Sequence, residues 1–251
     1  MDRGTYAAAS AGMASLLRLQ IVSNNLANAA TPGYKRQVLV GSEQSFEDTL
    51  AFKLGLNDRK IRGDHERVPG VVSLRTETDF SQGPIVKTGN DLDVALTHEG
   101  DFFVINTPSG EQYTRAGNFS LSDDGRLVTS DGFEVRGDGG AITIPAGGTI
   151  KIYENGSIRV NGEEVARLRV VRFDDPSGLK REGSSRFSLG NLPRPRRVDP
   201  EIVPRSLEMA NVSVVGSMVS LIAVNRGFES YTKVARAIDE MNRQSLSRRR
   251  I

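Results

Sequence analysis

The sequence contains no cysteine, no tryptophan and only two histidines, His65 and His98. A chain without cysteine forms no disulfides, no thiolate nucleophile and no cysteine-based metal site. Two histidines are too few for a His-rich metal centre. No apolar run approaches the roughly 18 residues that a membrane-spanning helix needs. These absences argue against thiol catalysis, a resident metal and direct insertion into a membrane.

The charges nearly cancel, because 33 Lys and Arg face 31 Asp and Glu, a net charge of +2. Such a balance gives no bulk field that favours nucleic acid or an anionic membrane. The basic run Arg248 to Arg250 has no aromatic platform beside it, and a solvated helix end explains it. We therefore expect no nucleic-acid partner.

The N-terminus does not have the pattern of a cleaved signal peptide. Asp2 offsets Arg3, and Arg18 and Gln20 interrupt a mostly Ala-rich apolar stretch. We expect either a cytoplasmic protein or export by a route that needs no cleaved leader.

Glycine and proline divide the chain into three parts. Of the 26 glycines, 17 lie between Gly83 and Gly190, and no proline precedes Pro32 or follows Pro204. Turn-forming residues are thus concentrated in the middle, and both ends are nearly free of helix breakers. This distribution predicts a turn-rich β centre flanked by two helices.

Both ends have helical spacing of apolar or small residues. From Ala8 to Leu26 the steps are 4, 3, 4, 3 and 4, and the helix should end before Thr31-Pro32-Gly33. At the other end, the apolar or small residues from Leu221 to Ile238 recur at alternating steps of 3 and 4, as in a heptad repeat. The predicted fold class is therefore α+β: a central, mainly antiparallel β domain with long N- and C-terminal α-helices that pair as a coiled-coil-like axial domain.

The middle contains recognisable hairpins. Phe102 to Ile105 runs into Pro108-Ser109-Gly110, and Gln112 to Arg115 returns. Asn155-Gly156 and Asn161-Gly162 predict two further hairpins with type I′ turns.

Catalytic templates are missing, and we predict no enzyme, no cofactor and no metal site. The chain has no P-loop, dinucleotide-binding, G-x-S-x-G or H-E-x-x-H motif. The glycine-rich stretch Gly137 to Gly140 leads into a strand and is interpreted as a turn. Asp91/Asp93, Asp123/Asp124 and Asp174/Asp175 fit turn chemistry. A calcium or catalytic role for these acid pairs stays open as the alternative.

The longer C-terminal helix has more apolar surface than the shorter, Ala- and Ser-rich N-terminal helix can cover. Burying a large apolar side chain contributes about 1.5–3 kcal/mol, so the uncovered stripe favours helices from other copies of the chain. A helical hairpin that rests on its own β domain is the alternative.

Three segments of the sequence resemble the bacterial flagellar rod and hook proteins. They are Ser23 to Arg36, then Thr88 to Leu96 with Tyr113 to Phe119, and finally Leu207 to Val212 continued by Met218 to Ile222, Arg226 to Glu229 and Lys233-Val234. The resemblance covers nearly the whole chain. About fifty residues separate Tyr34 from Gly83, which favours a proximal rod member, with a distal rod member as the alternative.

The resemblance implies a structural subunit of the flagellar basal-body rod in the periplasmic space. It implies export in an unfolded state by the flagellar type III apparatus, and assembly with copies of itself and with other rod proteins. A secreted β-rich protein that binds or cleaves glycans is the rival from another class; a cleaving one would need two acids that converge, with Asp91 or Asp93 among them.

The expected domains are a discontinuous terminal region (1–36 and 205–251), a connector (37–82), a β-rich domain (83–190) and an extended Pro/Arg connector (191–204). The expected assembly residues are Asn24, Asn25, Leu26, Asn28, Thr31, Pro32, Gly33 and Tyr34 in the N-terminal segment, and Asn211, Val212, Met218, Leu221, Val224, Phe228, Tyr231 and Ile238 in the C-terminal segment.

Overall fold

A computed structural model describes residues 3–43, 72–145 and 147–248. The chain divides into two compact units. We call the first the helical unit (Met1–Leu26, Gln37–Glu77 and Val214–Ile251) and the second the β unit (Ala27–Arg36 and Thr78–Ser213). The expected connector 37–82 lies partly outside the described residues, and the expected domain boundaries stay a prediction.

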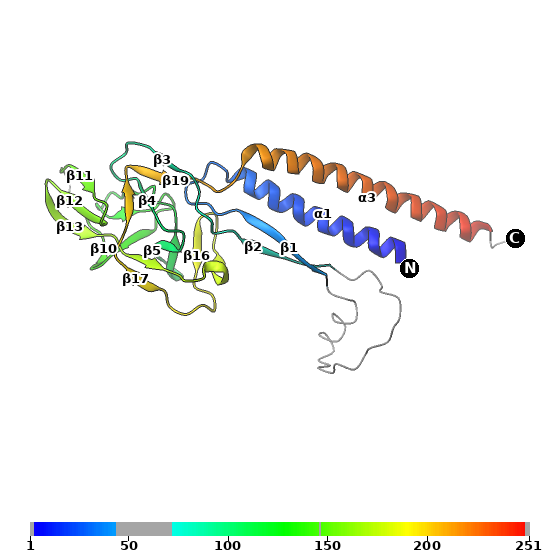
Figure 1. The fold of residues 1–251 in the computed structure, drawn as a ribbon, viewed down its shortest axis with the longest axis horizontal. Helices are drawn as coiled ribbons and strands as arrows, with labels where there is room; N and C mark the ends of the chain where they lie inside the picture. Colours follow the sequence, from blue (N-terminus) through cyan, green and yellow to red (C-terminus); the bar gives the residue numbers. More distant parts are fainter. Residues whose placement is uncertain (1–2, 44–71, 146, 249–251) are drawn as a thin grey trace. The chain divides into compact units, whose positions relative to one another are not determined.

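The helical unit contains one helix from each end of the chain and a strand pair. Helix α1 spans Arg3–Ala27 and helix α3 spans Val214–Arg248. Strands β1 (Gln37–Glu43) and β2 (Val72–Thr78) pair with each other (Figure 1). Helix α1 ends before Thr31-Pro32-Gly33, as its sequence predicts. Within the described ranges, neither helix combines the length and the apolar character that crossing a bilayer needs.

The prediction of long terminal helices that pair as a coiled coil is wrong. The chain is mostly β, and none of the described side chains of α3 is buried. Large apolar side chains are exposed on the described parts of both helices, among them Met13 (71%) and Val215 (73%). A coiled coil needs apolar knobs and holes on both partners, and the stripe of α1 offers mainly small residues such as Ala8, Gly12 and Ser15. The central β domain, by contrast, is confirmed.

The β unit consists of short strands joined by tight turns. In chain order they are β3 (Ile85–Lys87), β4 (Val94–Leu96), β5 (Asp101–Thr107), β6 (Gly110–Thr114), β7 (Ser120–Leu121), β8 (Leu127–Val128), β9 (Glu134–Gly137), β10 (Gly140–Ala141), β11 (Ile150–Ile152), β12 (Ser157–Val160), β13 (Glu163–Arg167), β14 (Val170–Arg172), β15 (Lys180–Arg181), β16 (Arg186–Ser188), β17 (Arg196–Val198), β18 (Ile202–Pro204) and β19 (Ser206–Glu208). One short 3₁₀ turn, η1 (Pro176–Gly178), precedes β15.

The main sheet has the order β15-β16-β6-β5-β9-β8-β7, with β10 beside β9 and β14 between β5 and β17. A second sheet has the order β11-β12-β13, and two short pairs, β18-β4 and β19-β3, complete the unit. The strand pairs of this unit are antiparallel. Strands β18 and β19, near the C-terminal end of the unit, thus pair with strands from its beginning.

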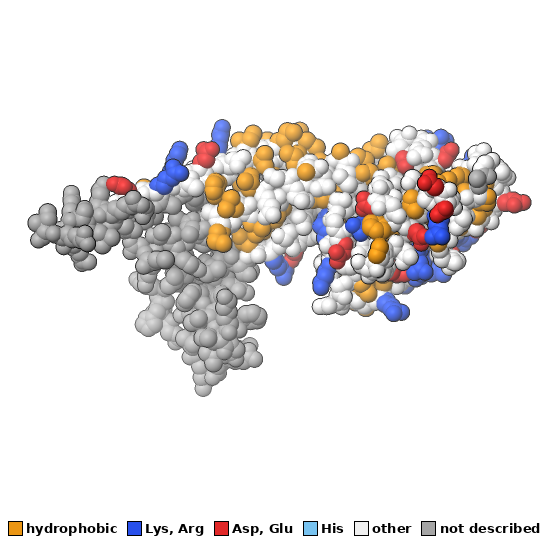
Figure 2. All heavy atoms as spheres, turned by 180° about the vertical axis from the view of Figure 1, so that it is seen from behind, with side chains coloured by type: hydrophobic (Ala, Val, Ile, Leu, Met, Phe, Trp, Pro, Cys, Tyr) orange, Lys and Arg blue, Asp and Glu red, His pale blue; other side chains and the backbone are white. Residues whose placement is uncertain are grey.

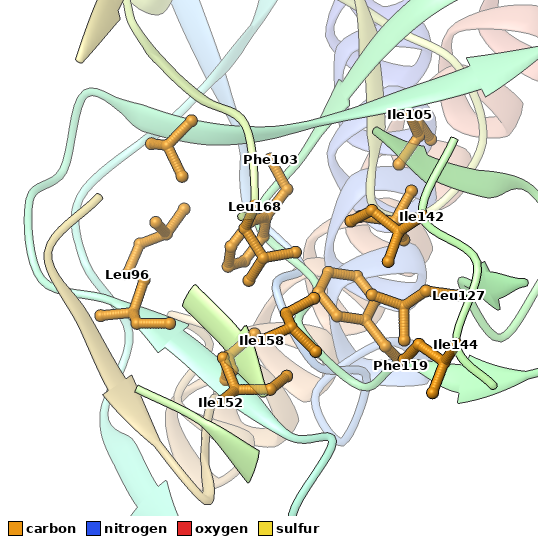
Figure 3. Packing of buried hydrophobic residues seen from close by; sticks show 14 of the residues in the cluster. Leu96, Phe103, Ile105, Phe119, Leu127, Ile142, Ile144, Ile152, Ile158 and Leu168 are labelled. Carbon is orange, nitrogen blue, oxygen red and sulfur yellow. The ribbon is translucent and has the colours of Figure 1, made fainter. Parts of the chain in front are cut away.

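Strand β5 lies between two hydrophobic clusters because successive side chains of a strand point to opposite faces. Phe103 and Ile105 join the larger cluster, which Figure 3 shows with Leu127, Ile142 and Leu168 among its members. Phe102 and Val104 face a smaller, aromatic-rich cluster on the other side. A strand buried on both faces needs a continuous apolar run, which the sequence has here.

The predicted hairpins are present, with one turn type corrected. Strands β5 and β6 pair across Pro108-Ser109-Gly110. Asn161 and Gly162 both have positive φ (53° and 96°), as a type I′ turn requires. At Asn155-Gly156 only the glycine has positive φ (75°), so that turn is not type I′. Instead, the side chain of Asn155 accepts a hydrogen bond from the backbone N–H of Ser157 at 3.1 Å. Such a bond between an Asn side chain and the nearby backbone favours a different turn conformation.

Candidate functional site: a buried charge cluster joining the terminal segments

The segment that follows α1 forms a compact turn bonded directly to the C-terminal segment. The N–H of Thr31 donates to the carbonyl of Asn28 (3.0 Å), and the N–H of Tyr34 donates to the carbonyl of Thr31 (3.3 Å). Between them, the N–H of Gly33 donates to the backbone carbonyl of Glu208 at 2.8 Å. Two segments about 175 residues apart in the sequence are therefore in contact within the β unit.

Gly33 has a backbone that only glycine adopts readily, with φ +68°. A Cβ atom at this position would lie 2.2 Å from the backbone N of Ala116 and 2.5 Å from the carbonyl carbon of Arg115. The turn after α1 thus packs directly on the backbone of the middle segment. Three segments that are distant in the sequence meet at this point.

A buried cluster of three charged side chains, Lys35, Arg115 and Glu208, lies at this junction, and we call it the charge cluster. Lys35 Nζ lies 2.7 Å from Glu208 Oε1. Arg115 Nε donates to Glu208 Oε2 at 2.8 Å, and Arg115 Nη2 lies 2.7 Å from the same oxygen. None of the three residues is more than 1% exposed. One residue comes from each of the three segments.

Backbone groups complete the coordination of these charges. Lys35 Nζ also donates to the carbonyl of Ser81 (2.7 Å), and the N–H of Gly83 donates to Glu208 Oε1 (3.0 Å). Arg115 Nη1 donates to the carbonyls of His98 and of Asp101, the latter at 2.7 Å. The cluster has one net positive charge, which these carbonyl dipoles stabilise.

Burial sets the electrostatics of the cluster. It lowers the pKa of Lys35; the carboxylate of Glu208 opposes this change, and the nearby Arg115 guanidinium adds to it. Breaking one partner of such a pair leaves a buried charge without compensation, which typically costs about 3–5 kcal/mol. The cluster is therefore a site at which the three segments depend on each other.

A second, more exposed group of polar contacts lies beside the cluster. Arg36 Nε donates to Asp79 Oδ2 (2.8 Å), and the N–H of Arg36 donates to Asn211 Oδ1 (2.7 Å). Asn211 Nδ2 in turn donates to the carbonyls of Asp79 (2.9 Å) and Ser81 (3.0 Å). Asn211 thus fastens the chain just before α3 to the segment that follows the first turn.

Asp79 gives this second group a dependence on pH. Burial raises the pKa of Asp79, but hydrogen bonds from Ser81 and the ion pair with Arg36 outweigh burial and lower it below 3.8. A depressed carboxyl pKa contributes stability that is complete above the unfolded-state pKa and is lost as the pH falls through the folded-state pKa. We expect the free energy of unfolding of Asp79→Asn to fall less than that of the wild type between pH 5 and pH 3. Denaturation at the two pH values measures this, and equal losses would contradict it.

Tyr34 and Arg181 pack against each other next to the charge cluster. Tyr34 is 1% exposed, and the Arg181 guanidinium lies over its ring at 4.7 Å from the centroid. Arg181 also donates to the backbone carbonyl of Lys35. Burial raises the pKa of Tyr34, an effect that the Arg181 charge partly offsets. The ring stays a neutral, packed aromatic at ordinary pH.

The N-terminal assembly residues predicted from the sequence divide between the two units. In the helical unit, the buried side chain of Asn25 exchanges two hydrogen bonds of 2.8 Å with the backbone of Gln37. Asn24 is exposed and Leu26 is half-buried. In the β unit, Asn28 Oδ1 accepts from the Thr31 hydroxyl at 3.4 Å. Residues of the turn are half-buried or buried: Asn28, Thr31, Pro32, Gly33 and Tyr34.

The C-terminal set divides similarly. Asn211 and Val212 are half-buried in the β unit. On α3, Leu221, Val224 and Phe228 share one half-buried face, whereas Met218 is 49% exposed. The side chains of Tyr231 and Ile238 are not among those that the structure describes. The roles of these residues in assembly stay a prediction.

Sequence reasoning did not select Lys35, Arg115 or Glu208 as site residues, although all three lie in or beside the segments that carry the resemblance. A charged residue in a turn or at a strand end is usually solvated, so type and spacing alone gave no reason to single them out. Their common feature is visible only when the fold brings them together.

The acid pair Asp91/Asp93, which was a candidate for catalysis, has structural partners. Asp93 is buried and accepts from the Thr88 hydroxyl (2.6 Å) and from Asn90 Nδ2 (3.0 Å). Asp91 Oδ1 lies 3.2 Å from Arg205 Nε. Among the residues whose placement is described, no group of three or more His, Asp or Glu side chains forms a potential metal site.

Comparison with known protein families gives three matches. The family described as "Flagella basal body rod protein" matches residues 6–35, "Flagellar hook protein FlgE/F/G D1 domain" matches 98–160, and "Flagellar basal body rod FlgEFG protein C-terminal" matches 203–248. Lys35 and Glu208 fall within the two terminal matches, and Arg115 falls within the central one.

Curated relatives match over nearly the full length. The "Flagellar basal-body rod protein FlgF" of Caulobacter vibrioides is 33% identical over 99% of this chain and 98% of its own. The FlgF of Rhizobium meliloti is 33% identical over 94% of this chain and 93% of its own. The "Flagellar basal-body rod protein FlgG" of Caulobacter vibrioides is 31% identical over 93% of this chain and 94% of its own.

The chain therefore belongs to the flagellar basal-body rod protein family, whose place is the rod of the flagellar basal body. Its similarity is to FlgF first and to FlgG next.

Proposed function

We propose that this chain is a non-enzymatic structural subunit of the proximal rod, exported unfolded by the flagellar type III apparatus and assembled with its own copies and with other rod proteins through its terminal helices. The full-length similarity to FlgF proteins supports the rod assignment. The surface of the two helices supports their role in assembly.

The observation that carries the assembly proposal is the apolar surface of α3. Five large hydrophobic side chains in its first three turns are exposed: Val214, Val215, Met218, Val219 and Ile222. Figure 2 shows hydrophobic side chains gathered on this part of the helix. Helix α1 adds Met13 and Leu16, 71% and 47% exposed. Exposed apolar patches of this kind mark interaction surfaces.

The charge cluster joins the segment that follows α1 to the segment that precedes α3 within the β unit. Lys35 lies a few residues after α1, and Glu208 a few residues before α3. Their contact fixes the segments that lead to both helices on the same β unit. Because removing one partner of a buried ionic contact is strongly destabilising, each of these segments depends on the other for its place in the β unit.

Phe228→Asp tests the assembly role of α3. Phe228 shares the half-buried face of α3 with Leu221 and Val224. A carboxylate on this face would have to be buried without a partner in the assembled rod, which costs several kcal/mol. We expect cells with this variant to lose motility in soft agar, while circular dichroism of the purified chain still shows the β signal of the wild type.

Ser230→Asp is the matched control, because Ser230 is exposed and lies about 200° around the helix from Phe228. We expect this control to swim normally. Normal swimming of the Phe228→Asp cells would contradict the proposal, whereas loss of the β signal would show that the variant misfolds. In that case Phe228→Ser, which removes the apolar contact without adding a charge, should still reduce motility.

A further inference from the structure

A concave pocket of about 560 Å³ lies within the β unit, on one face of the sheet β11-β12-β13. It is separate from the charge cluster. Lys151 and Tyr153 come from β11 and its turn, and Ser157 and Arg159 come from β12. These four side chains share a face because they are two residues apart on their strands. Arg205 and Asp91 close the pocket from the neighbouring segments.

Two cations face each other in this pocket. Lys151 and Arg159 are directly opposite in the strand register, and like charges in this position destabilise a sheet. Neither forms an ion pair with a carboxylate in the part of the chain that the structure describes. The arrangement costs stability in the isolated chain, and an anion bound between the two side chains would offset that cost.

Two buried polar atoms of the pocket also lack a partner. Ser157 is fully buried, and its hydroxyl has no hydrogen-bond partner; the same holds for Arg159 Nε. Buried polar groups are nearly always hydrogen-bonded, so each exception needs an explanation. Neither atom is accessible to solvent, so a ligand oxygen would bond with Arg159 Nε and the Ser157 hydroxyl only after the Arg159 side chain moves.

The net charge of the pocket indicates the net charge of a ligand that would match it. Lys151, Arg159 and Arg205 face two carboxylates, Asp91 and Glu154, which leaves one net positive charge. A monoanion matches this balance, whereas a segment with several acids would meet Asp91 and Glu154 at close range. The two carboxylates instead accept hydrogen bonds from neutral hydroxyl groups.

The aromatic ring of the pocket indicates the body of the ligand. Tyr153 is 41% exposed, and the Arg159 guanidinium lies over one face of its ring at 4.9 Å. A ring with one covered face and considerable exposure offers an apolar platform beside the charged groups. Cations for one carboxylate, acceptors for hydroxyls and an aromatic platform together fit an acidic sugar.

We propose that this pocket binds a saccharide that carries a carboxylate. The carboxylate lies between Lys151 and Arg159. Sugar hydroxyls donate to Glu154 and Asp91, and the sugar ring packs against Tyr153. None of the residues that line this pocket belongs to the charge cluster or to the assembly residues named above.

Titration of the full-length, isotopically labelled chain by NMR tests this inference with a matched pair of probes, methyl β-glucuronide and methyl β-glucoside. The two differ in one carboxylate. We expect the glucuronide to shift resonances of Lys151, Tyr153 and Arg159, and the glucoside to bind at least about tenfold more weakly, since it lacks the charge-assisted hydrogen bonds. Equal binding of both probes, or no shift at these residues, would overturn the proposal.

Variants locate the site. Lys151→Gln combined with Arg159→Gln should reduce glucuronide binding at least about tenfold, whereas Lys87→Gln combined with Arg196→Gln, which removes the same charge from exposed positions, should leave it unchanged. Arg159→Lys keeps the charge and removes Nε; it should give an intermediate loss if the double variant does not fold. Tighter binding of a Gly-Asp-Asp-Gly peptide than of the glucuronide would overturn the proposal in favour of an acidic protein partner.

Discussion

Glu208→Gln lowers the free energy of unfolding of the chain by about 3–5 kcal/mol, the usual cost of removing one partner from a buried ionic contact. Glu208 accepts from Lys35, Arg115 and the N–H of Gly83, all within 3.0 Å. Glutamine keeps the shape but has no charge, and its amide NH₂ would face donors. Two buried cations are then left without an anion. Urea denaturation of the purified chain, followed by circular dichroism, measures the change.

Glu201→Gln is the matched control. Glu201 also pairs with a basic side chain, His98 at 3.0 Å, but its own side chain is 69% exposed. Exposed pairs contribute only about 0–1 kcal/mol, so the control should stay near the wild type. A similar small loss for both variants would show that the charge cluster does not hold the terminal segments.

Lys35→Met added to Glu208→Gln separates charge from packing. The double variant removes one of the two uncompensated cations and replaces it by an apolar side chain of similar length. We expect it to recover part of the stability that Glu208→Gln loses, since residues in one network do not act additively. Strictly additive losses would assign the effect to packing alone.

The hairpins and the main strands could be predicted because their rules are local. A turn such as Asn161-Gly162 depends on two adjacent residues, and β5 is visible as an apolar run. The turn at Asn155 differed in type because the Asn side chain bonds to the backbone N–H of Ser157. That choice between two local interactions depends on how the flanking strands lie.

The helix pairing and the charge cluster could not be predicted, for different reasons. Periodicity indicates that a helix has an apolar face, but not what covers it. The coiled-coil pairing with the N-terminal helix was therefore wrong, and contact of Leu221, Val224 and Phe228 with helices of other copies stays a prediction. The cluster depends on residues up to 173 positions apart in the sequence. No local pattern distinguishes the buried Glu208 from the exposed Glu201. The pairing of β19 with β3 and the packing of the turn at Gly33 on the backbone of Ala116 bring its members together.

Gly33→Ala should reduce the free energy of unfolding by about 2–5 kcal/mol, a loss comparable to that of Glu208→Gln, because an αL backbone cost of about 1–2 kcal/mol adds to an overpacking cost of about 1–3 kcal/mol. The added Cβ would lie 2.2 Å from the backbone N of Ala116. The backbone of Ala116 cannot rotate away from the added Cβ atom as the end of a flexible side chain could. The turn would have to move, and the hydrogen bond from Gly33 to the carbonyl of Glu208, 2.8 Å long, would be lost.

Gly132→Ala separates these two costs. Gly132 also has positive φ, +83°, but a Cβ there would have no atom within 4 Å. Its substitution therefore carries only the backbone cost of about 1–2 kcal/mol. If both alanine variants unfold at the same urea concentration, close packing of the turn on the middle segment contributes nothing. If Gly33→Ala lowers the free energy of unfolding clearly more than Gly132→Ala does, a stable β unit requires the contact between the turn and the middle segment. Gly33→Ala should then also impair motility, whereas Gly132→Ala should not.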